Sequence, residues 1–282
     1  AWVKAVISKL FGTGEIKSKL NADIAVSKDM SEAIDLWGAL YEDKAPWLNK
    51  NVQSMNLASS IANEIARLTT LEFESEITGN NERAEYLNKQ YRRVLNHLKE
   101  YCEIGCAKGG VVFKPYIYEN RIEIDVVSAD QFFPTVSGNA GDITGAVFVE
   151  RTVDGRSFYT RLERHELNGT NYHVTNKAFR SDHESELGNE VPLDSVEKWS
   201  DIAPEATIIN VDTVLFSYFK MPIANNIDRT SPLGVSCFVK AVKHIEEADK
   251  QWSRLLWEFE GGELAVDVDR DALQFMESTD GK

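Results

Sequence analysis

The hydrophobic residues change their spacing near residue 110, and this change restricts the chain to a fold that combines helices with an antiparallel sheet. Before that point apolar residues recur every three or four positions, as they do on one face of a helix. The expected helices cover about 31–41, 57–71 and 81–107, with a short amphipathic helix from Trp2 to Phe11. Lys108-Gly109-Gly110 supplies the glycines expected just beyond the end of a helix.

The next hundred residues contain short runs rich in β-branched and aromatic residues, separated by turn-forming pairs. Asn168-Gly169 joins 156–166 to 170–178 and predicts the clearest hairpin of the chain. Further strands are expected at 111–118, 121–127, 143–153 and, as a buried strand, 213–219. The polar stretch 181–204 reads as a surface loop or a partly mobile flap. The order predicts an antiparallel meander in an α+β fold rather than a doubly wound nucleotide-binding sheet.

One helix of unusual length is expected after the meander. Ser231-Pro232 has the pattern of an N-cap followed by proline, and no helix breaker occurs before Gly261-Gly262. A helix over 231–260 would have roughly 29 residues and a length of about 44 Å, whereas the mean helix has about 11–12 residues.

The two sides of this helix differ in chemistry. The apolar stripe consists of Phe238, Val242, Ile245, Trp252, Leu256 and Phe259. The basic stripe, which also contains Glu247, consists of Lys240, Lys243, Lys250 and Arg254. A core helix with a solvated back explains the pattern, and so does a projecting helix that packs against copies of itself.

The charge and composition exclude several classes of protein. The net charge is −14, and residues 181–282 alone carry 21 acidic against 9 basic side chains. A broad basic face for nucleic acid is therefore excluded, and any contact with DNA must be local. No apolar run approaches the roughly 20 residues of a membrane span, and Trp2 to Phe11 lacks the features of a signal peptide. The three cysteines are too few for a disulfide framework and indicate a reducing cytosol.

The motifs that would carry chemistry are incomplete. A phosphate-binding loop and an esterase elbow are both absent from the sequence. Cys102 and Cys106 could offer two thiolates to zinc, but the third cysteine is the remote Cys237, so buried structural thiols are the better interpretation. His165-Glu166 is expected to be a surface pair rather than a catalytic dyad. Three aspartates have the spacing found at the start of a calcium-binding loop, but the two diagnostic positions of that loop carry other residues than it requires. These aspartates are Asp267, Asp269 and Asp271.

These observations predict no catalytic residue, no metal site and no cofactor, and they favour a structural or interaction protein over an enzyme. One alternative remains open, a cytosolic α+β enzyme whose site is assembled from scattered residues.

Several longer stretches resemble the portal proteins of long-tailed phages and prophages of Gram-positive bacteria. The most specific stretches are 219–222 with 224–228, 231–236 and 248–260. Weaker matches are 33–37 with 41–47, 65–72, 107–110, 128–135 and 164–169. The resemblance extends over nearly the whole chain, which makes it more specific than any short motif.

This resemblance implies a homo-oligomeric ring, typically of twelve subunits, at one vertex of the virion capsid. Such a ring admits double-stranded DNA pumped by the terminase large subunit, holds it and later releases it through the tail, and it is not itself an ATPase. The implied partners also include the head-tail adaptor and the capsid and scaffold proteins, with no membrane. The protein would be made in the cytoplasm of the bacterial host. Another head-completion or adaptor protein of the capsid remains an alternative to the portal.

The resemblance also implies a domain order. Residues 1–50 would form N-terminal helices, 51–230 the wing, 231–260 the first stem helix and 261–282 the start of the clip. The apolar stripe would pack against neighbouring subunits, and the basic stripe would form a local band facing DNA. Portal subunits of this type are considerably longer, with a second stem helix, a tunnel loop and a crown after the clip, so we expect a truncated chain.

Overall fold

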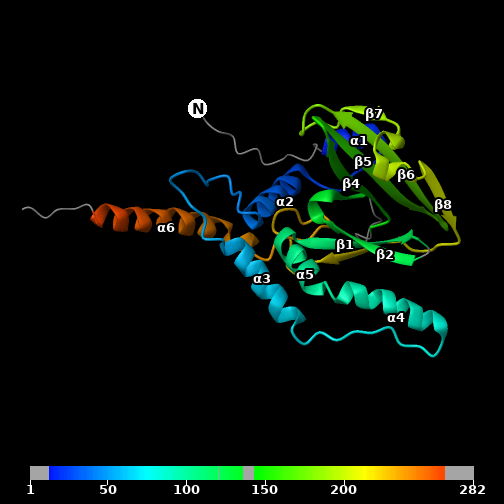
Figure 1. Cartoon of the computed structure of the whole chain (residues 1–282), viewed down its shortest axis with the longest axis horizontal. Helices are drawn as coiled ribbons and strands as arrows, with labels where there is room; N and C mark the ends of the chain where they lie inside the picture. Colours follow the sequence, from blue (N-terminus) through cyan, green and yellow to red (C-terminus); the bar gives the residue numbers. More distant parts are fainter. Residues whose placement is uncertain (1–12, 120, 136–142, 264–282) are drawn as a thin grey trace, which may run out of the picture. The chain divides into compact units, whose positions relative to one another are not determined.

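The computed structural model describes residues 13–119, 121–135 and 143–263 (Figure 1). The chain forms two compact units, of which the first contains 1–46 and 56–242 and the second contains 47–55 and 243–282. The expected helix from Trp2 to Phe11 and the three aspartates of the calcium-like motif lie outside the described residues. Among the described helices, none combines the length and the apolar character that a membrane span requires.

The first unit begins with helices, as the sequence predicts. They are α1 (Thr13–Leu20), α2 (Lys28–Tyr41), α3 (Leu57–Thr70), α4 (Glu82–Leu95) and α5 (Leu98–Lys108). The hydroxyl of Ser27 caps α2 by accepting the N–H of Met30, and α2 buries Ile34 and Trp37. The predictions of helices at 31–41 and 57–71 are confirmed.

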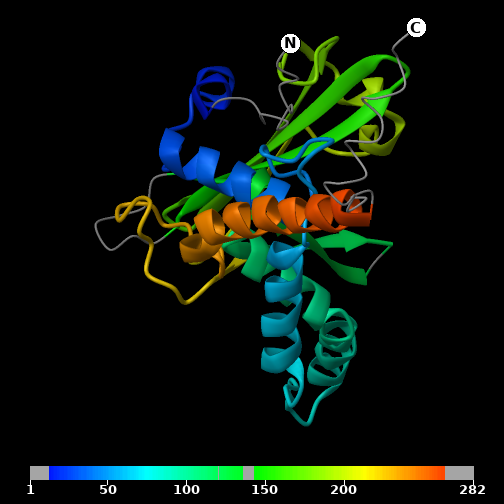
Figure 2. The same ribbon diagram turned by 90° about the vertical axis from the view of Figure 1, so that its left-hand side faces the viewer.

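The single helix expected over 81–107 is wrong, because the chain turns at Asn96 and His97. The two resulting helices differ in burial. Helix α5 packs on α3, β1 (Gly110–Tyr118) and β2 (Arg121–Ser128), whereas α4 is largely exposed and contacts β2. Figure 2 shows α3 beside α4 and α5. Ala62 and Ala66 of α3 are fully buried, so small side chains let the helices approach closely.

The larger sheet has six strands and is antiparallel throughout. Its strands are β3 (Phe132–Thr135), β4 (Gly145–Asp154), β5 (Ser157–Asn168), β6 (Asn171–Ser181), β7 (Asn189–Val191) and β8 (Glu205–Ile209). Strands β7 and β8 both pair with β6. The predicted hairpin is confirmed: Asn168 faces Asn171 across the turn, and Gly169 adopts a φ of 63°. The α+β class with an antiparallel meander is confirmed as well.

A smaller sheet has the order β2-β1-β9, and β9 spans Ser217–Lys220. The prediction of a buried strand over 213–219 is wrong in its start and in its burial. The strand begins later, and the deeply buried aromatic residue is Phe216, which precedes it. Phe216 packs edge-on against Phe132 and Phe148 of the larger sheet, so the apolar residues before β9 serve the core rather than the strand.

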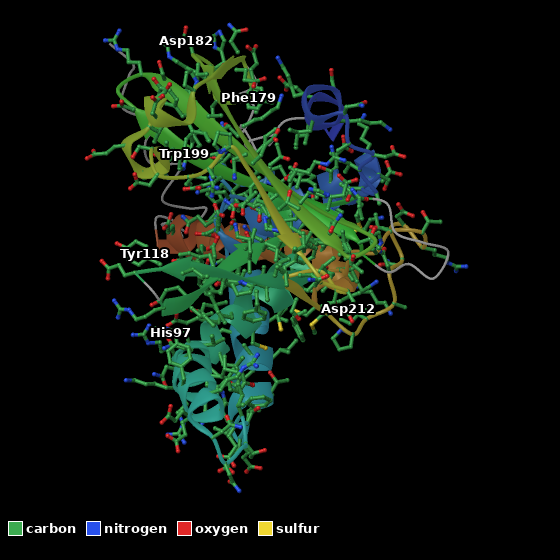
Figure 3. All side chains as sticks on the ribbon, turned by 90° about the vertical axis from the view of Figure 1, so that its right-hand side faces the viewer. His97, Tyr118, Phe179, Asp182, Trp199 and Asp212 are labelled. Atoms are coloured by element: carbon green, nitrogen blue, oxygen red, sulfur yellow. The ribbon has the colours of Figure 1, made fainter. Side chains whose placement is uncertain are left out.

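The polar segment 181–204 lies mostly at the surface, as predicted, but short regular elements and buried side chains attach it to the sheet. It contains β7 and two 3₁₀ turns, η2 (Leu193–Ser195) and η3 (Glu197–Trp199). Leu187 and Trp199 are fully buried and hold the segment on the sheet. Figure 3 shows Trp199 and Phe179 on the side of the larger sheet where this segment lies. Two apolar side chains therefore outweigh a polar composition.

The long helix begins later than the sequence predicts. Helix α6 spans Val242–Glu263, and the 3₁₀ turn η4 (Val239–Ala241) precedes it. Its 22 residues correspond to about 33 Å. The helix also continues through Gly261 and Gly262, where an end was expected.

Residues 231–238 are not helical because they are buried in the first unit. Leu233 and Val235 are fully buried, and the N–H of Gly234 donates to the Tyr218 hydroxyl at 2.9 Å. A Cβ on Gly234 would lie 2.1 Å from the carbonyl oxygen of Gly109. Tertiary packing thus overrides the Ser-Pro start signal, and Gly234 is needed for the close approach of two backbones.

Candidate functional site

The second unit consists of α6 and the segment Trp47–Met55, which we call the strap. Asp249 of α6 is only 1% exposed. Its carboxylate accepts the indole N–H of Trp47 and the backbone N–H of Met55, both at 2.8 Å. A buried carboxylate with two N–H donors is satisfied without a basic partner, and charge-assisted hydrogen bonds of this kind are strong.

Ser253 adds a second attachment one turn further along α6. Its hydroxyl accepts the backbone N–H of Gln53 and donates to the carbonyl of Asp249, each at 2.8 Å. Within the strap, Asn49 and Val52 exchange two backbone hydrogen bonds at 3.1 Å. The strap is therefore a folded turn fixed to one face of α6.

The residues of the predicted apolar stripe have different surroundings. Phe238 is buried in the first unit before η4, Ile245 is buried, and Val242 and Leu256 are half-buried. Trp252 is 38% exposed and Phe259 is 68% exposed.

One further apolar residue of α6 is exposed. Leu255, which the sequence pattern did not single out, is 43% exposed. Trp252, Leu255 and Phe259 are spaced by three and four residues, so they form one exposed apolar face next to the face that carries Asp249 and Ser253.

The basic residues of the predicted stripe also differ. Lys240 lies in η4 and is exposed. Lys243 and Arg254 are exposed on α6, and among the described residues they form no ion pair. Lys250 contacts Glu246 at 2.6 Å and Glu247 at 3.4 Å, and the hydrogen bond to Glu246 raises its pKa. Lys243, Lys250 and Arg254 share the side of α6 opposite the exposed apolar face.

Comparison with known protein families identifies the kind of molecule. The sequence profile of the family described as phage portal protein, SPP1 Gp6-like, matches residues 25–268. The chain belongs to this family. The match includes α2 to α6 and the strap. No curated protein matches the chain. Portal proteins of this family are structural components of the phage head, where they form oligomeric rings.

The portal chain also contains a buried polar cluster that resembles a catalytic arrangement. The expectation that His165 and Glu166 form a surface pair is wrong. His165 is buried, and its ring nitrogens lie 2.7 Å from Oε1 of Glu163 and 2.7 Å from the hydroxyl of Tyr172. Glu166 instead contacts Arg164 at 3.0 Å. In a strand, residues two apart point to the same side, and this period places His165 with Glu163 rather than with Glu166.

Glu163 carries the charge of this cluster. Burial opposes its ionisation, but the hydrogen bond from His165 and the charges of Lys114 and Arg161 outweigh burial and hold the pKa of Glu163 well below its ordinary value. Lys114 lies 2.6 Å from Glu163 and 4.9 Å from the centre of the Phe148 ring. Every charged group in the cluster has a partner, so the cluster stabilises the portal sheet core.

Three cysteines of the portal chain come together, although the sequence separates Cys237 from the other two. The thiol of Cys106 lies close enough to the thiols of Cys102 and Cys237 for the three groups to shift one another's pKa values. In the described ranges, no group of three or more His, Cys, Asp or Glu side chains is arranged to hold a metal ion. The spacing of four indicates that Cys102 and Cys106 are neighbours, but the proximity of Cys237 depends on tertiary packing and has no signal in the sequence spacing.

The strap generates a first prediction. Replacing Asp249 with alanine removes the acceptor for two buried N–H groups and should lower the free energy of unfolding by about 2–4 kcal/mol. Urea denaturation measures this loss, and the amide of Met55 should exchange hydrogen faster. Glu258→Ala removes the same charge from an exposed position of the same helix and should have an effect below about 0.5 kcal/mol. Equal effects of the two variants would contradict this role of Asp249.

The Glu163 cluster generates a second prediction, on pH dependence. Because the folded pKa of Glu163 is depressed, its ionisation stabilises the fold above the ordinary glutamate pKa of about 4.3, and this stability is lost as the pH falls below that value. Glu163→Gln should lower the free energy of unfolding by about 3 kcal/mol near pH 7. The free energy of unfolding of this variant should also fall less steeply with decreasing pH (the acid limb of its pH profile). The half-buried Glu166→Gln serves as the control and should leave the acid limb unchanged. If the free energy of unfolding of Glu163→Gln fell with acid as steeply as that of the wild type, Glu163 would not be the group responsible for this pH dependence.

Proposed function

We propose that the chain is a ring-forming portal subunit at the unique vertex of the capsid, and that the ring is the channel for packaging and ejection of DNA. The observation that carries this proposal is the family match over residues 25–268. The partners are further copies of the chain, double-stranded DNA, the terminase large subunit, the head-tail adaptor, and the capsid and scaffold proteins. In this proposal the first unit is mostly wing, α6 is the first stem helix, and the clip begins after α6.

The exposed apolar face of α6 is the proposed contact between subunits. Trp252, Leu255 and Phe259 are large side chains in contact with water, and burial of such surface contributes about 25 cal/mol per Å². The strap covers an adjacent face through Asp249 and Ser253 and leaves this one open. Adjacent helices pack at about 8–10 Å, a distance at which these side chains interdigitate with a neighbouring copy. Leu256 and Val242, which are half-buried, extend the contact along α6.

The basic side of α6 is the proposed DNA-facing band. Lys243, Lys250 and Arg254 lie along one side, and Lys240 precedes them in η4. The contacts of Lys250 with Glu246 and Glu247 reduce the local positive charge. A channel in which DNA must slide needs few strong phosphate contacts, because each one adds to the affinity and slows release. The acidic balance of residues 181–282 agrees with this requirement.

Ring formation is tested by native mass spectrometry at low salt. We expect a closed ring of about twelve subunits for the unmodified chain, the number that the family typically forms. The triple variant Trp252→Ser, Leu255→Ser, Phe259→Ser should shift the population to smaller species, because it removes most of the exposed apolar face. Trp257→Ser is the control, since Trp257 is 73% exposed on a different side of the same helix. A triple variant that assembles like the control would contradict the proposed contact between subunits.

The DNA-facing band is tested in an infectious phage that carries this chain. Changing Lys240, Lys243, Lys250 and Arg254 to glutamine should shorten the packaged DNA or reduce its retention, because the band no longer contacts phosphates. Pulsed-field electrophoresis of DNA from purified particles measures the length. The control changes four exposed basic residues of the first unit, Lys28, Lys44, Arg67 and Arg121, and should package normally. An unchanged packaged length in the first variant would exclude the band.

A further inference from the structure

Cys106 and Cys237 are held together by the backbone of the first unit. The N–H of Cys237 donates to the carbonyl of Cys106 at 2.9 Å, and the hydroxyl of Ser236 approaches the same carbonyl at 3.4 Å. This hydrogen bond brings the two backbones into direct contact, as the Cα separation of about 4.4–6.8 Å in disulfide-linked cysteines requires. The two cysteines are thus aligned although 131 residues separate them in the sequence.

The side chains bring the sulfur atoms together as well. The Cys106 thiol lies close enough to the Cys237 and Cys102 thiols to influence their pKa values, and it lies 3.9 Å from the sulfur of Met221. Cys102 and Cys106 are four residues apart on α5, a spacing that puts Cβ atoms about 5–6 Å apart. A disulfide requires a Cβ separation of about 3.5–4.5 Å. The helix therefore keeps Cys102 from bonding to Cys106, and Cys237 is the thiol that reaches it.

We propose that Cys106 and Cys237 form a modification site, at which a hydroperoxide oxidises the two thiols to an intrachain disulfide. The thiolate sulfur of Cys237 attacks one oxygen of hydrogen peroxide, the O–O bond breaks, and the product is a sulfenic acid on Cys237 with hydroxide, which takes up a proton to give water. The sulfur of Cys106 then displaces the sulfenic oxygen, the S–O bond breaks, and the thiol proton of Cys106 leaves with that oxygen as a second water. Two thiols and one peroxide give one disulfide and two waters.

The surroundings assign the two roles. Cys237 is half-buried, whereas Cys106 is buried, so the peroxide reaches Cys237 first. The hydrogen bond with Cys106 lowers the pKa of the Cys237 thiol against the effect of burial, and the Ser236 hydroxyl supports this. For Cys106, the hydrogen bond with Cys102 acts to lower the pKa, but the hydrogen bond with Cys237 and burial outweigh it and raise the pKa to about 12. Cys237 is therefore the nucleophile and Cys106 the resolving thiol.

The disulfide would close a loop of the chain that contains both sheets of the first unit. It would also link α5 to Cys237, which lies five residues before the start of α6. A loop of this length removes much of the conformational freedom of the unfolded chain, so the disulfide stabilises the first unit. Thiols stay reduced in the cytosol, while particles outside the cell are in an oxidising environment. The timing of the bond, after release of the particle, rests on the proposed function; the reaction itself requires only this chain.

The experiment oxidises the purified full chain. The reduced protein is treated with hydrogen peroxide at neutral pH, the remaining thiols are alkylated, and peptides are mapped by mass spectrometry. We expect two of the three thiols to disappear, a linked pair of peptides containing Cys106 and Cys237, and faster migration in non-reducing denaturing gels. The melting temperature should rise by about 5–10 °C, and a reductant should reverse the rise.

Three variants test the assigned roles. Cys106→Ser should leave a sulfenic acid on Cys237 that a 1,3-diketone probe labels, and Cys237→Ser should leave Cys106 reduced. The matched control, Cys102→Ser, should form the disulfide as the wild type does.

A bond that contains Cys102, a bond between two chains, or two thiols that stay free at peroxide concentrations that oxidise a solvent-exposed model thiol would overturn the proposal. The mapping in the unmodified chain decides the question even if a variant fails to fold. Because the oxidation is measured on the isolated chain, its failure leaves ring formation untouched, and a failure of ring assembly leaves the oxidation result unchanged.

Discussion

The close approach of Gly234 to the turn at Gly109 determines how the C-terminal part of the first unit is organised. Gly109 ends α5 with a φ of 87°, and a side chain at Gly234 would collide with its carbonyl oxygen. The backbone of 233–237 can therefore lie against the start of β1 and bury Leu233 and Val235. Because this segment is occupied by packing, α6 cannot begin before Val242.

The features that depend on neighbouring residues could be predicted from the sequence. The Asn168-Gly169 hairpin and the helix that ends at Lys108 follow from local turn and cap chemistry. The features that depend on distant residues could not. Asp249 receives its hydrogen bonds from residues about two hundred positions away, and nothing near it in the sequence indicates those partners. One signal was available, because a carboxylate in line with Ile245 and Leu256 interrupts an otherwise apolar side of the helix.

The two buried carboxylates solve the same problem with different partners. Glu163 is neutralised by Lys114 and Arg161 and oriented by His165, so its environment is ionic. Asp249 is satisfied by an indole N–H and a backbone N–H. A sequence shows both as acidic residues among many, and only their burial separates them from the acidic surface. The polar stretch 181–204 shows the converse, since Leu187 and Trp199 fold it onto the sheet despite its composition.

The strap has a mechanical consequence. The chain passes between the two units at 46–47, at 55–56 and at 242–243, so the second unit is connected to the first by three covalent crossings rather than one. Two of these crossings run through a segment that is hydrogen-bonded to the middle of the helix at Asp249 and Ser253. A force that separates the strap from α6 must therefore break the hydrogen bonds of Asp249 and Ser253.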